Sequence, residues 1–526
     1  MAIGYPIYWL ELYVFRGGHG KTTPLAWIIF CVLALIVFFQ NHPRLIAGTR
    51  NFLAWFAQES LSVKLLLISI GIGAVAILLC AFYASLLPPH LVQEFDALNY
   101  HLTLPRQHLL RGSFSHIPWS TVDLFFLPID FALAPFWLAT LLPNKLPQFF
   151  FVLGLLGVCS RLAWRFSGGK IWPSVLLVLA VLGSHNIGIQ LGTAMLDVVV
   201  CYLFLAALDS FLSRAIWLGV IELSFYVWSK PLIPVQFLVT LVTFSLVWLL
   251  LWVFGIRKNT WVASGEKIKE FAGNTRCALT RGLGLFLLFS LFVAGPFILK
   301  SLRYSGTPLF PLGVGVFRTL SIPQSPERWV ELKLKATQLS VIKDQYGSGR
   351  NLLEFARHFW LIAVPEKGVN NRYDYPLGLM YLLFLGPFLF FFFSSLRQKI
   401  LPLLSLWVVV SWGIWWLGSQ QTRFLFVPLI LMYLAVVLSI RVPSRVLLGV
   451  MLGAILLVSA SVYRANKQDL GRWKEAVLRQ QDKELVQLGK DNQSAEVIKL
   501  PFYDIAYATF PVEVVDNDSV FVLNTE

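Results

Sequence analysis

The sequence predicts an all-α membrane protein that crosses the bilayer many times. Of its 526 residues, 57% are hydrophobic and only 13% are charged, whereas a soluble domain carries about 25% charged residues. The mean hydropathy is +0.69, and the apolar residues are gathered in runs of helix length. These observations favour a bundle of about 11 to 13 transmembrane helices, because one crossing needs about 20 residues.

The apolar runs define the expected helices in chain order. Several runs are short for a full crossing, which is typical of half-helices or of helices buried against their neighbours. A first run, 5–15, is too short to count. The expected spans are 25–40, 65–88, 122–142, 146–165, 171–190, 196–213, 215–229, 231–255, 282–299, 376–396, 400–418, 424–440 and 446–463.

Basic residues set the expected orientation, because Lys and Arg are concentrated in cytoplasmic loops. The segment 256–282 is the most basic connection, and Arg397, Lys399, Arg441 and Arg445 mark two further cytoplasmic turns. Two segments then fall on the outer side, about 89–121 and 300–375, and we expect them to bear short amphipathic helices. The net charge of +15 is explained by these loops, so we expect no nucleic-acid partner.

One pair of runs leaves the orientation open. If both 122–142 and 146–165 crossed the membrane, the basic residues that follow would lie outside, against the usual bias. One run of the pair is therefore expected to be re-entrant or to lie along the surface, and the sequence does not decide which. The basic residues are Arg161, Arg165 and Lys170, and the pair contains Pro128, Pro135, Pro143 and Pro147.

The chain divides into a transmembrane module, 1–463, and a small outer tail, 464–526. The tail holds an amphipathic stretch, 472–490, and a β-like end, SVFVLNTE. We expect no cleavable signal peptide, because no basic head precedes the first apolar residues. We also expect no structural disulfide, because none of the five cysteines lies in a predicted outer segment.

The stretch EFDALNYHLTLPRQHL, 94–109, places unusual chemistry where the 65–88 helix leaves the membrane. Its carboxylates and imidazoles could deprotonate a hydroxyl or hold a divalent metal. The alternative is that Asp96 caps the next helix. The polar members of the stretch are Glu94, Asp96, Asn99, Tyr100, His101, Arg106 and His108.

Four further charged residues are expected at the same outer side. Asp197 heads an apolar run, where it is either a functional group or a helix cap. Lys230, Arg303 and Arg423 lie on the side where cations are disfavoured, so each either binds an anion or anchors its helix at the interface. If they converge, the cations could neutralise a phosphate while an acid activates a nucleophile.

The order of these motifs resembles the GT-C superfamily of polytopic glycosyltransferases. The bacterial branch related to the protein mannosyltransferases and the aminoarabinose transferase of lipid A is the most similar. The resemblance spans most of 65–440 and lies in EFDALNYHLTLPRQHLLRGSF, GTAMLD at 192–197, LRYSGTPLFPLG at 302–313 and SQQTRFLFVP at 419–428. The first motif reads E-x-D where the family has adjacent acids, Thr307 stands where Asn is usual, and the tail is short.

The resemblance implies a GT-C-like bundle that transfers a sugar from a polyprenyl-phosphate donor to an acceptor hydroxyl, with inversion, at the outer face. Asp96, or Glu94 beside it, would be the general base. The acceptor would be a glycan, a lipid or a protein, and the chain would lie in a bacterial inner membrane with its site facing the periplasm. The residues implied for substrate and phosphate are Tyr100, Arg106, Lys230, Arg303, Gln420 and Arg423, and those that could ligate Mg²⁺, Mn²⁺ or Zn²⁺ are Asp96, His101 and Asp197.

Two other classes of function stay open on the sequence. A transporter or lipid flippase would place its ionisable residues near the midplane, often in repeated halves, whereas these charges lie at one face and no repeat is visible. A structural membrane protein would not need acids and cations at one leaflet. The outer loop 318–375 is either a lid over the donor or a plain connector.

Overall fold

The computed structural model describes most of the bundle and little of the tail. The described residues are 1, 4–14, 23–86, 94, 96–117, 120, 122–137, 145–230, 233–253, 265–311, 330, 332–334, 337, 346–364, 373–395, 401–440, 444–478, 496–499 and 506–509.

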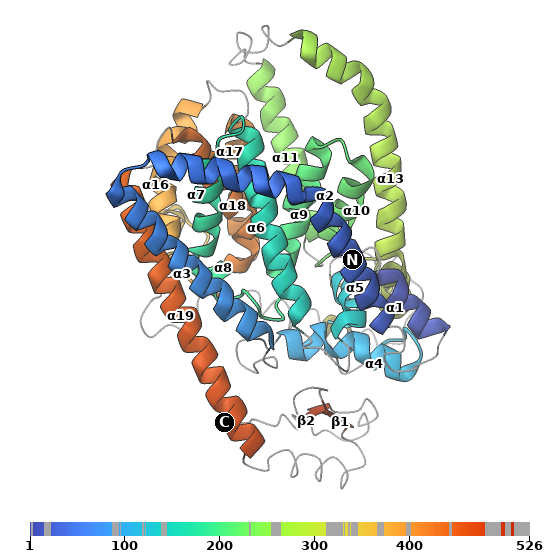
Figure 1. Cartoon of the computed structure of the whole chain (residues 1–526). Helices are drawn as coiled ribbons and strands as arrows, with labels where there is room; N and C mark the ends of the chain where they lie inside the picture. Colours follow the sequence, from blue (N-terminus) through green and yellow to red (C-terminus); the bar gives the residue numbers. More distant parts are fainter. Residues whose placement is uncertain are drawn as a thin grey trace.

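These residues form a bundle of helices (Figure 1). The first third of the chain contains α1 (Gly4–Tyr13), α2 (Thr23–Gln58), α3 (Leu61–Leu86), the π-helix η1 (Ala97–His101), α4 (Thr103–Arg111), α5 (Pro128–Trp137) and α6 (Leu146–Phe166). The middle contains α7 (Ile171–Leu182), α8 (His185–Gly188), α9 (Asp197–Leu212), α10 (Ile216–Val227), α11 (Ile233–Val253) and α13 (Gly265–Ser305). The last part contains α15 (Leu352–Leu361), α16 (Leu379–Ser395), α17 (Leu401–Leu417), the 3₁₀-helix η4 (Thr422–Leu425), α18 (Phe426–Ser439) and α19 (Arg445–Leu478).

Five helical segments of the described chain are long and apolar enough to cross a membrane. They are Leu61–Leu86, Leu146–Phe166, Gly282–Ser305, Thr422–Ser439 and Arg445–Lys467. Five shorter apolar helices accompany them, at Ile171–Leu182, Ile216–Val227, Ile233–Leu246, Leu379–Phe391 and Leu404–Leu417. The prediction of a polytopic helical membrane protein is therefore confirmed at this level.

Two expected segments differ from the sequence prediction. In the run 122–142 the first six residues form a turn, and helix α5 begins only at Pro128, with Pro135 inside it; the residues after Trp137 lie outside the described part. The following run forms α6, which is long enough to cross. The predicted basic loop 256–282 is helical from Gly265 onward, since α13 begins there, and its earlier part lies outside the described residues.

The helix ends form two groups. At one end, Arg161 and Arg165 of α6 meet Asp209 of α9, with a 2.9 Å ion pair from Arg161. At the other end, Asp197 at the start of α9 forms an ion pair with Lys230 in the turn that follows α10. In Figure 1, α2 runs crosswise to α3, α6 and α19 along the first of these ends, and η1 and α4 lie at the second. We call the second the site end.

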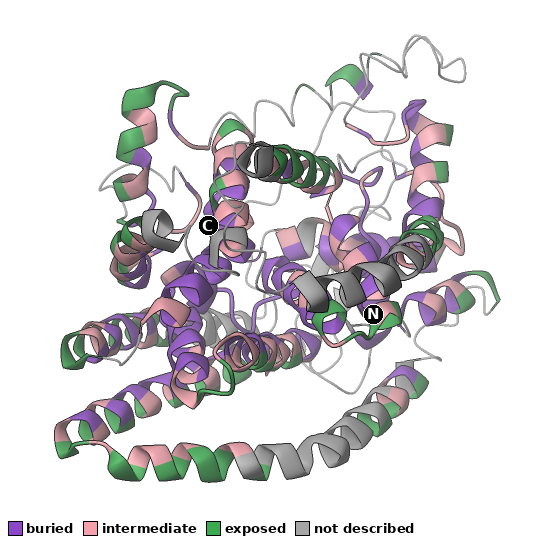
Figure 2. Ribbon diagram, turned by 90° about the horizontal axis from the view of Figure 1, so that it is seen from above, coloured by how far each residue is buried: buried purple, intermediate pink, exposed green. Residues whose placement is uncertain are grey.

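α18 forms the centre of the bundle. Phe426 to Val437 are all buried, and α18 packs against α7, α9, α16 and α17. Buried positions gather in the middle of the bundle, while the rim helices expose apolar side chains (Figure 2), such as Leu61 at 72% exposure and Ile72 at 67%. Helices that expose many large apolar side chains on one surface are expected to contact lipid there.

The tail is described only in part. α19 continues from its apolar span to Leu478, so the predicted amphipathic stretch 472–490 begins as helix and then leaves the described residues. Two short antiparallel strands follow, β1 (Glu496–Lys499) and β2 (Ala506–Thr509), with Glu496 opposite Thr509. The predicted β-like end at 519–526 lies outside the described residues. Four cysteines, Cys31, Cys80, Cys159 and Cys201, are free.

Candidate active site

Asp96 lies directly before the single π-helical turn η1. The turn is closed by a hydrogen bond from the Leu102 backbone N–H to the Ala97 carbonyl, 2.9 Å long. Such turns often mark functional positions. The Asp96 side chain makes no capping hydrogen bond to η1, so the alternative that it caps the next helix does not hold here.

Arg423 connects the first outer segment to the start of α18. Its Nη1 donates to Asp96 Oδ2 over 2.6 Å, and its Nε lies 3.1 Å from Asp374 Oδ2. Burial would raise the pKa of Asp96, but the charge and hydrogen bond of Arg423, together with the charges of His101 and Lys230, hold that pKa below its usual value. Asp96 is therefore an ionised carboxylate committed to a cation.

Asp374 differs from Asp96 in three ways. Its backbone φ is +78°, a left-handed conformation that few side chains other than Asn and Asp adopt. Its Oδ2 has no hydrogen-bond partner, since the Arg423 Nε–H is not aligned with it. Burial raises the pKa of Asp374 to about 6, despite the opposing charge of Arg423.

Thr422 holds Asp374 in this conformation. The Thr422 backbone N–H donates to the Tyr373 carbonyl over 2.9 Å, and the Tyr375 N–H donates to Thr422 Oγ1 over 3.2 Å. Both neighbours of Asp374 are thus tied to the residue before Arg423. A strained residue held from both sides is a common feature of functional sites.

Asp197 and Lys230 form a second ion pair beside a cavity. Lys230 Nζ lies 2.5 Å from Asp197 Oδ1 and 5.2 Å from the centre of the Phe424 ring, while Asp197 Oδ2 has no hydrogen-bond partner. Asp197, Lys230 and Arg423 all line one cavity between α9, α10, α11, α17 and α18. The rest of its wall is Val200, Cys201, Tyr226, Ile233, Gln236, Phe237, Thr240, Trp407, Ser411, Phe424, Phe426, Val427 and Pro428.

We call Asp96, Asp197, Lys230, Asp374 and Arg423 the cavity cluster. Four of these five were expected to converge, and the structure brings them together through Arg423 and Lys230. Tyrosines surround the cluster: the negative charge of Asp96 helps to raise the pKa of Tyr100 and of Tyr346, after burial in each case. With three acids and two cations, the cluster has acceptors for a proton and donors for an anion.

Glu94 does not lie in this cluster as a free base. Its Oε1 accepts from Lys145 Nζ over 2.8 Å and its Oε2 accepts from the Ala194 N–H over 2.6 Å. The side chain is buried. This geometry ties the first outer segment to the turn before Asp197, so the structure favours a positioning role for Glu94 and leaves Asp96 as the accessible carboxylate of the motif.

The proposed metal ligands do not form a set. His101 Nδ1 lies 2.5 Å from Asp130 Oδ1, whereas Asp96 and Asp197 each pair with a cation. Among the residues described, no three His, Cys, Asp or Glu side chains are grouped as metal ligands. Because each predicted ligand is already bound to a different partner, these residues do not fit a resident metal ion.

Gln420 supports a glycine turn at Gly347. Its Oε1 accepts from the Ser348 N–H over 2.6 Å and its Nε2 donates to the Trp416 carbonyl over 3.0 Å. Gly347 has φ +90°, and a Cβ there would clash with the Gln420 side chain. Gln420 therefore positions Tyr346 and its neighbours, and its side chain is not available to bind phosphate in this structure.

Arg303 and Arg106 take no part in the ion pairs of the cavity cluster. Arg303 is exposed at the end of α13, where its guanidinium carbon lies 5.5 Å from the Tyr304 ring centre. That ring is 5.3 Å from the His116 ring, so Arg303 neighbours a different group of residues. Arg106 lies on α4, partly exposed.

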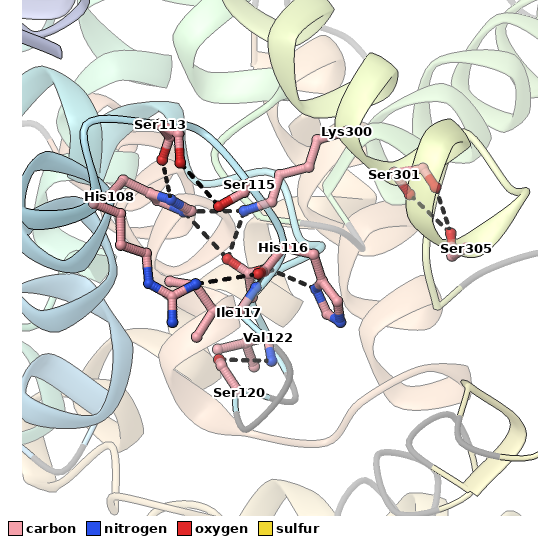
Figure 3. Close-up of polar contacts among 12 residues, drawn as sticks. His108, Ser113, Ser115, His116, Ile117, Ser120, Val122, Lys300, Ser301 and Ser305 are labelled. Atoms are coloured by element: carbon pink, nitrogen blue, oxygen red, sulfur yellow. Dashed lines mark hydrogen bonds and ion pairs between the residues drawn. The ribbon is translucent and has the colours of Figure 1, made fainter. Parts of the chain in front are cut away.

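Next to Tyr304, a second group of charged residues is formed by His108, His116, Asp123 and Lys300 (Figure 3). We call it the sealed cluster, because His108, Asp123 and Lys300 are buried. Asp123 Oδ1 accepts from Lys300 Nζ over 2.5 Å, and Oδ2 accepts from His116 and from the Ile117 N–H over 2.9 and 2.8 Å. Lys300 also donates to His108 Nε2 over 3.0 Å. Burial would raise the pKa of Asp123, but Lys300 and the histidines hold it well below its usual value.

The sealed cluster was not found from the sequence. Of its members only His108 stands in a predicted motif, because Asp123 lies in the apolar run 122–142 and Lys300 directly follows the run 282–299. Asp374 was missed as well, because the segment RYDYP at 372–376 has no motif character. One signal could have found it: Asp374, like Asp96 and Asp197, lies just outside the end of an apolar run.

Comparison of the chain with protein-family models, with curated proteins and with solved structures found no match.

Proposed function

We propose that the protein is a glycosyltransferase that takes a sugar from a polyprenyl-phosphate donor at the outer face of the membrane. The observation that carries the proposal is the cavity cluster itself. Lys230 and Arg423 line a largely apolar and aromatic cavity among membrane helices, and three carboxylates accompany them. A lipid phosphate needs both features, since its headgroup is anionic and its chain is apolar.

The cations would bind the donor phosphate. The Lys230 ammonium is a compact positive charge, and the Arg423 guanidinium is planar with several N–H donors. Both groups bind phosphate oxygens well. Each is now paired with a carboxylate, so the phosphate would join or replace Asp197 and Asp96 as the partner. As the sugar–phosphate bond breaks, its electron pair goes to the phosphate oxygen, where positive charge stabilises it.

A carboxylate of the cluster would take the acceptor proton. The acceptor oxygen forms the new bond to the anomeric carbon from the face opposite the phosphate, which inverts that centre. The sequence resemblance assigns the base to Asp96. The motif order also supports a bacterial inner membrane with the cluster toward the periplasm, and an acceptor that is a glycan, a lipid or a protein.

The test uses the full-length protein in liposomes with a panel of radiolabelled polyprenyl-phosphate hexoses and pentoses, and with cell envelope extract as the acceptor source. We expect the wild type to release polyprenyl phosphate from one donor and to transfer its label. Asp96→Asn should lose at least about 100-fold of that rate while remaining folded. Asp209→Asn, which removes an ion-paired carboxylate at the opposite end of the bundle, is the matched control and should keep full activity.

Two results would count against the proposal. Full activity in Asp96→Asn would remove Asp96 from the mechanism. A wild type that cleaves no donor of the panel but moves a fluorescent polyprenyl phosphate across the liposome bilayer would favour the flippase instead.

A further inference from the structure

The proposed function leaves one carboxylate of the cavity cluster without a role. Asp96 is bound to Arg423 Nη1 by a hydrogen bond of 2.6 Å. Asp197 Oδ1 is bound to Lys230 by a hydrogen bond of 2.5 Å, although its Oδ2 has no hydrogen-bond partner. Asp374 touches Arg423 only at 3.1 Å, without hydrogen-bond alignment, and its Oδ2 is buried and unpartnered. A buried unpartnered carboxylate oxygen requires an explanation, because such groups are rare in native proteins.

Structural roles do not explain Asp374. A carboxylate that served only to neutralise Arg423 would be expected to align with its N–H groups, as Asp96 does. Its backbone conformation also brings no stability of its own, since a left-handed φ of +78° is unfavourable for a residue with a side chain. The chain nevertheless holds that conformation, because the Thr422 N–H donates to the Tyr373 carbonyl and Thr422 Oγ1 accepts from the Tyr375 N–H.

We infer that Asp374 is a further catalytic residue, the group that receives the acceptor proton, while Asp96 stays ionised and holds Arg423 in place. This inference rests on the proposed function and refines its assignment of the base. In the transfer step the acceptor oxygen bonds to the anomeric carbon and the carbon–oxygen bond to phosphate breaks with its electron pair. The hydroxyl proton passes to the free Asp374 oxygen.

The electrostatic surroundings suit this division. The charged groups that act on Asp374 are Arg423 and Lys230, which lower its pKa, and Asp96 and Asp197, which raise it, after the larger effect of burial. Tyr346 and Tyr375 add nearby phenols. With a pKa of about 6, Asp374 is ionised at neutral pH and is a stronger base than Asp96, whose pKa lies below its usual value.

The experiment compares pH–rate profiles of kcat/KM for the full-length wild type and variants, with the donor of the panel that turns over. Asp374→Asn is the main variant, because Asn is the other side chain that tolerates the left-handed conformation. Asp374→Gly is the second, since glycine adopts that conformation freely. Binding of unlabelled polyprenyl phosphate is measured in parallel.

We expect the wild-type rate to fall as the pH drops through about 6. Asp374→Asn and Asp374→Gly should lose about 100-fold of the rate, lack this acid limb and bind polyprenyl phosphate within about twofold of the wild type. In Asp96→Asn the residual activity should keep the limb but shift it to lower pH, because the negative charge that raises the pKa of Asp374 is gone.

The outcomes separate the two claims. If either folded Asp374 variant keeps the wild-type rate and acid limb, the inference is overturned while the proposed function stands. If the wild type binds polyprenyl phosphate but cleaves no donor, the proposed function fails and this inference fails with it.

Discussion

The cavity cluster and the sealed cluster are built from the same kinds of residue at the same end of the bundle, yet their charges are satisfied differently. In the sealed cluster, Asp123 has a partner on each oxygen and Lys300 is held between Asp123 and His108. In the cavity cluster, Asp197 and Asp374 each have an oxygen with no hydrogen bond, and Arg423 Nε is not aligned. Asp197, Lys230 and Arg423 of the cavity cluster also line a cavity.

The difference teaches how to separate structural from functional charge in a membrane bundle. Buried ions with every atom paired hold segments together, and removing one partner is costly. Buried ions with unpaired atoms beside a cavity retain the capacity to bind something else. On this basis we assign the sealed cluster to fixing the first outer segment against α13, and the cavity cluster to substrate.

Removing Lys300 is the most direct test of the structural role assigned to the sealed cluster. Lys300→Met should destabilise the protein by about 3–5 kcal/mol, because it leaves Asp123 buried without its cation. The melting temperature of the detergent-solubilised protein measures the effect. The double variant Lys300→Met with Asp123→Asn should recover much of the loss, since no charge is then stranded.

A small loss in Lys300→Met, with transfer activity abolished, would contradict the assignment. That result would mean that the sealed cluster acts on substrate and that full pairing is no guide to a structural role.

The pH dependence of folding stability tests the role of His108 in the sealed cluster. Its Nδ1 faces the Ser113 carbonyl at 3.2 Å, so that nitrogen carries the proton and Nε2 accepts from Lys300. Burial lowers the pKa of His108 to about 4 from 6.5. As the pH falls below 6.5, the unfolded chain binds the proton first, so stability is full above that pH and is lost progressively down to about 4. The total is on the order of 3 kcal/mol.

The measurement is the melting temperature from pH 8 to about 4 for the wild type and for His108→Gln, whose amide keeps a donor and an acceptor. Subtracting the two curves removes the contributions of other groups. A difference that does not change between pH 6.5 and 4.5 would show that His108 has the same pKa in the folded and the unfolded protein.

The sequence predicted the fold where length and composition suffice. Long apolar runs such as Leu61–Leu86 became long helices, because the period and length of a run are local properties. The run 122–142 differs at its start: its composition is that of a span, but a turn with the buried Asp123 precedes the helix, which begins at Pro128. The average hydropathy of a run does not show where the chain turns within it.

The candidate site was predictable only in part. Asp96, Asp197, Lys230 and Arg423 were expected from charges at the ends of apolar runs, and the structure joins them. Arg303 satisfied the same rule and lies elsewhere, and Glu94 proved to be bound at both oxygens. The rule gives the depth of a residue along a helix but not the direction of its side chain, which depends on neighbours distant in the sequence.

The last prediction concerns the charge balance between Lys230 and Asp197. Lys230→Gln should weaken binding of polyprenyl phosphate about tenfold, since one charge-assisted hydrogen bond to phosphate contributes about 1.5 kcal/mol or more. Asp197→Asn should leave that affinity equal or higher, because it frees Lys230 from a competing anion. Lys170→Gln, an exposed lysine on the turn after α6, is the control and should change nothing. If Lys230→Gln and Asp197→Asn weaken binding equally, the ion pair serves to hold α9 and the end of α10 together. Its role would then be structural, like that of the sealed cluster, and the proposed difference between the two clusters would be wrong for this pair.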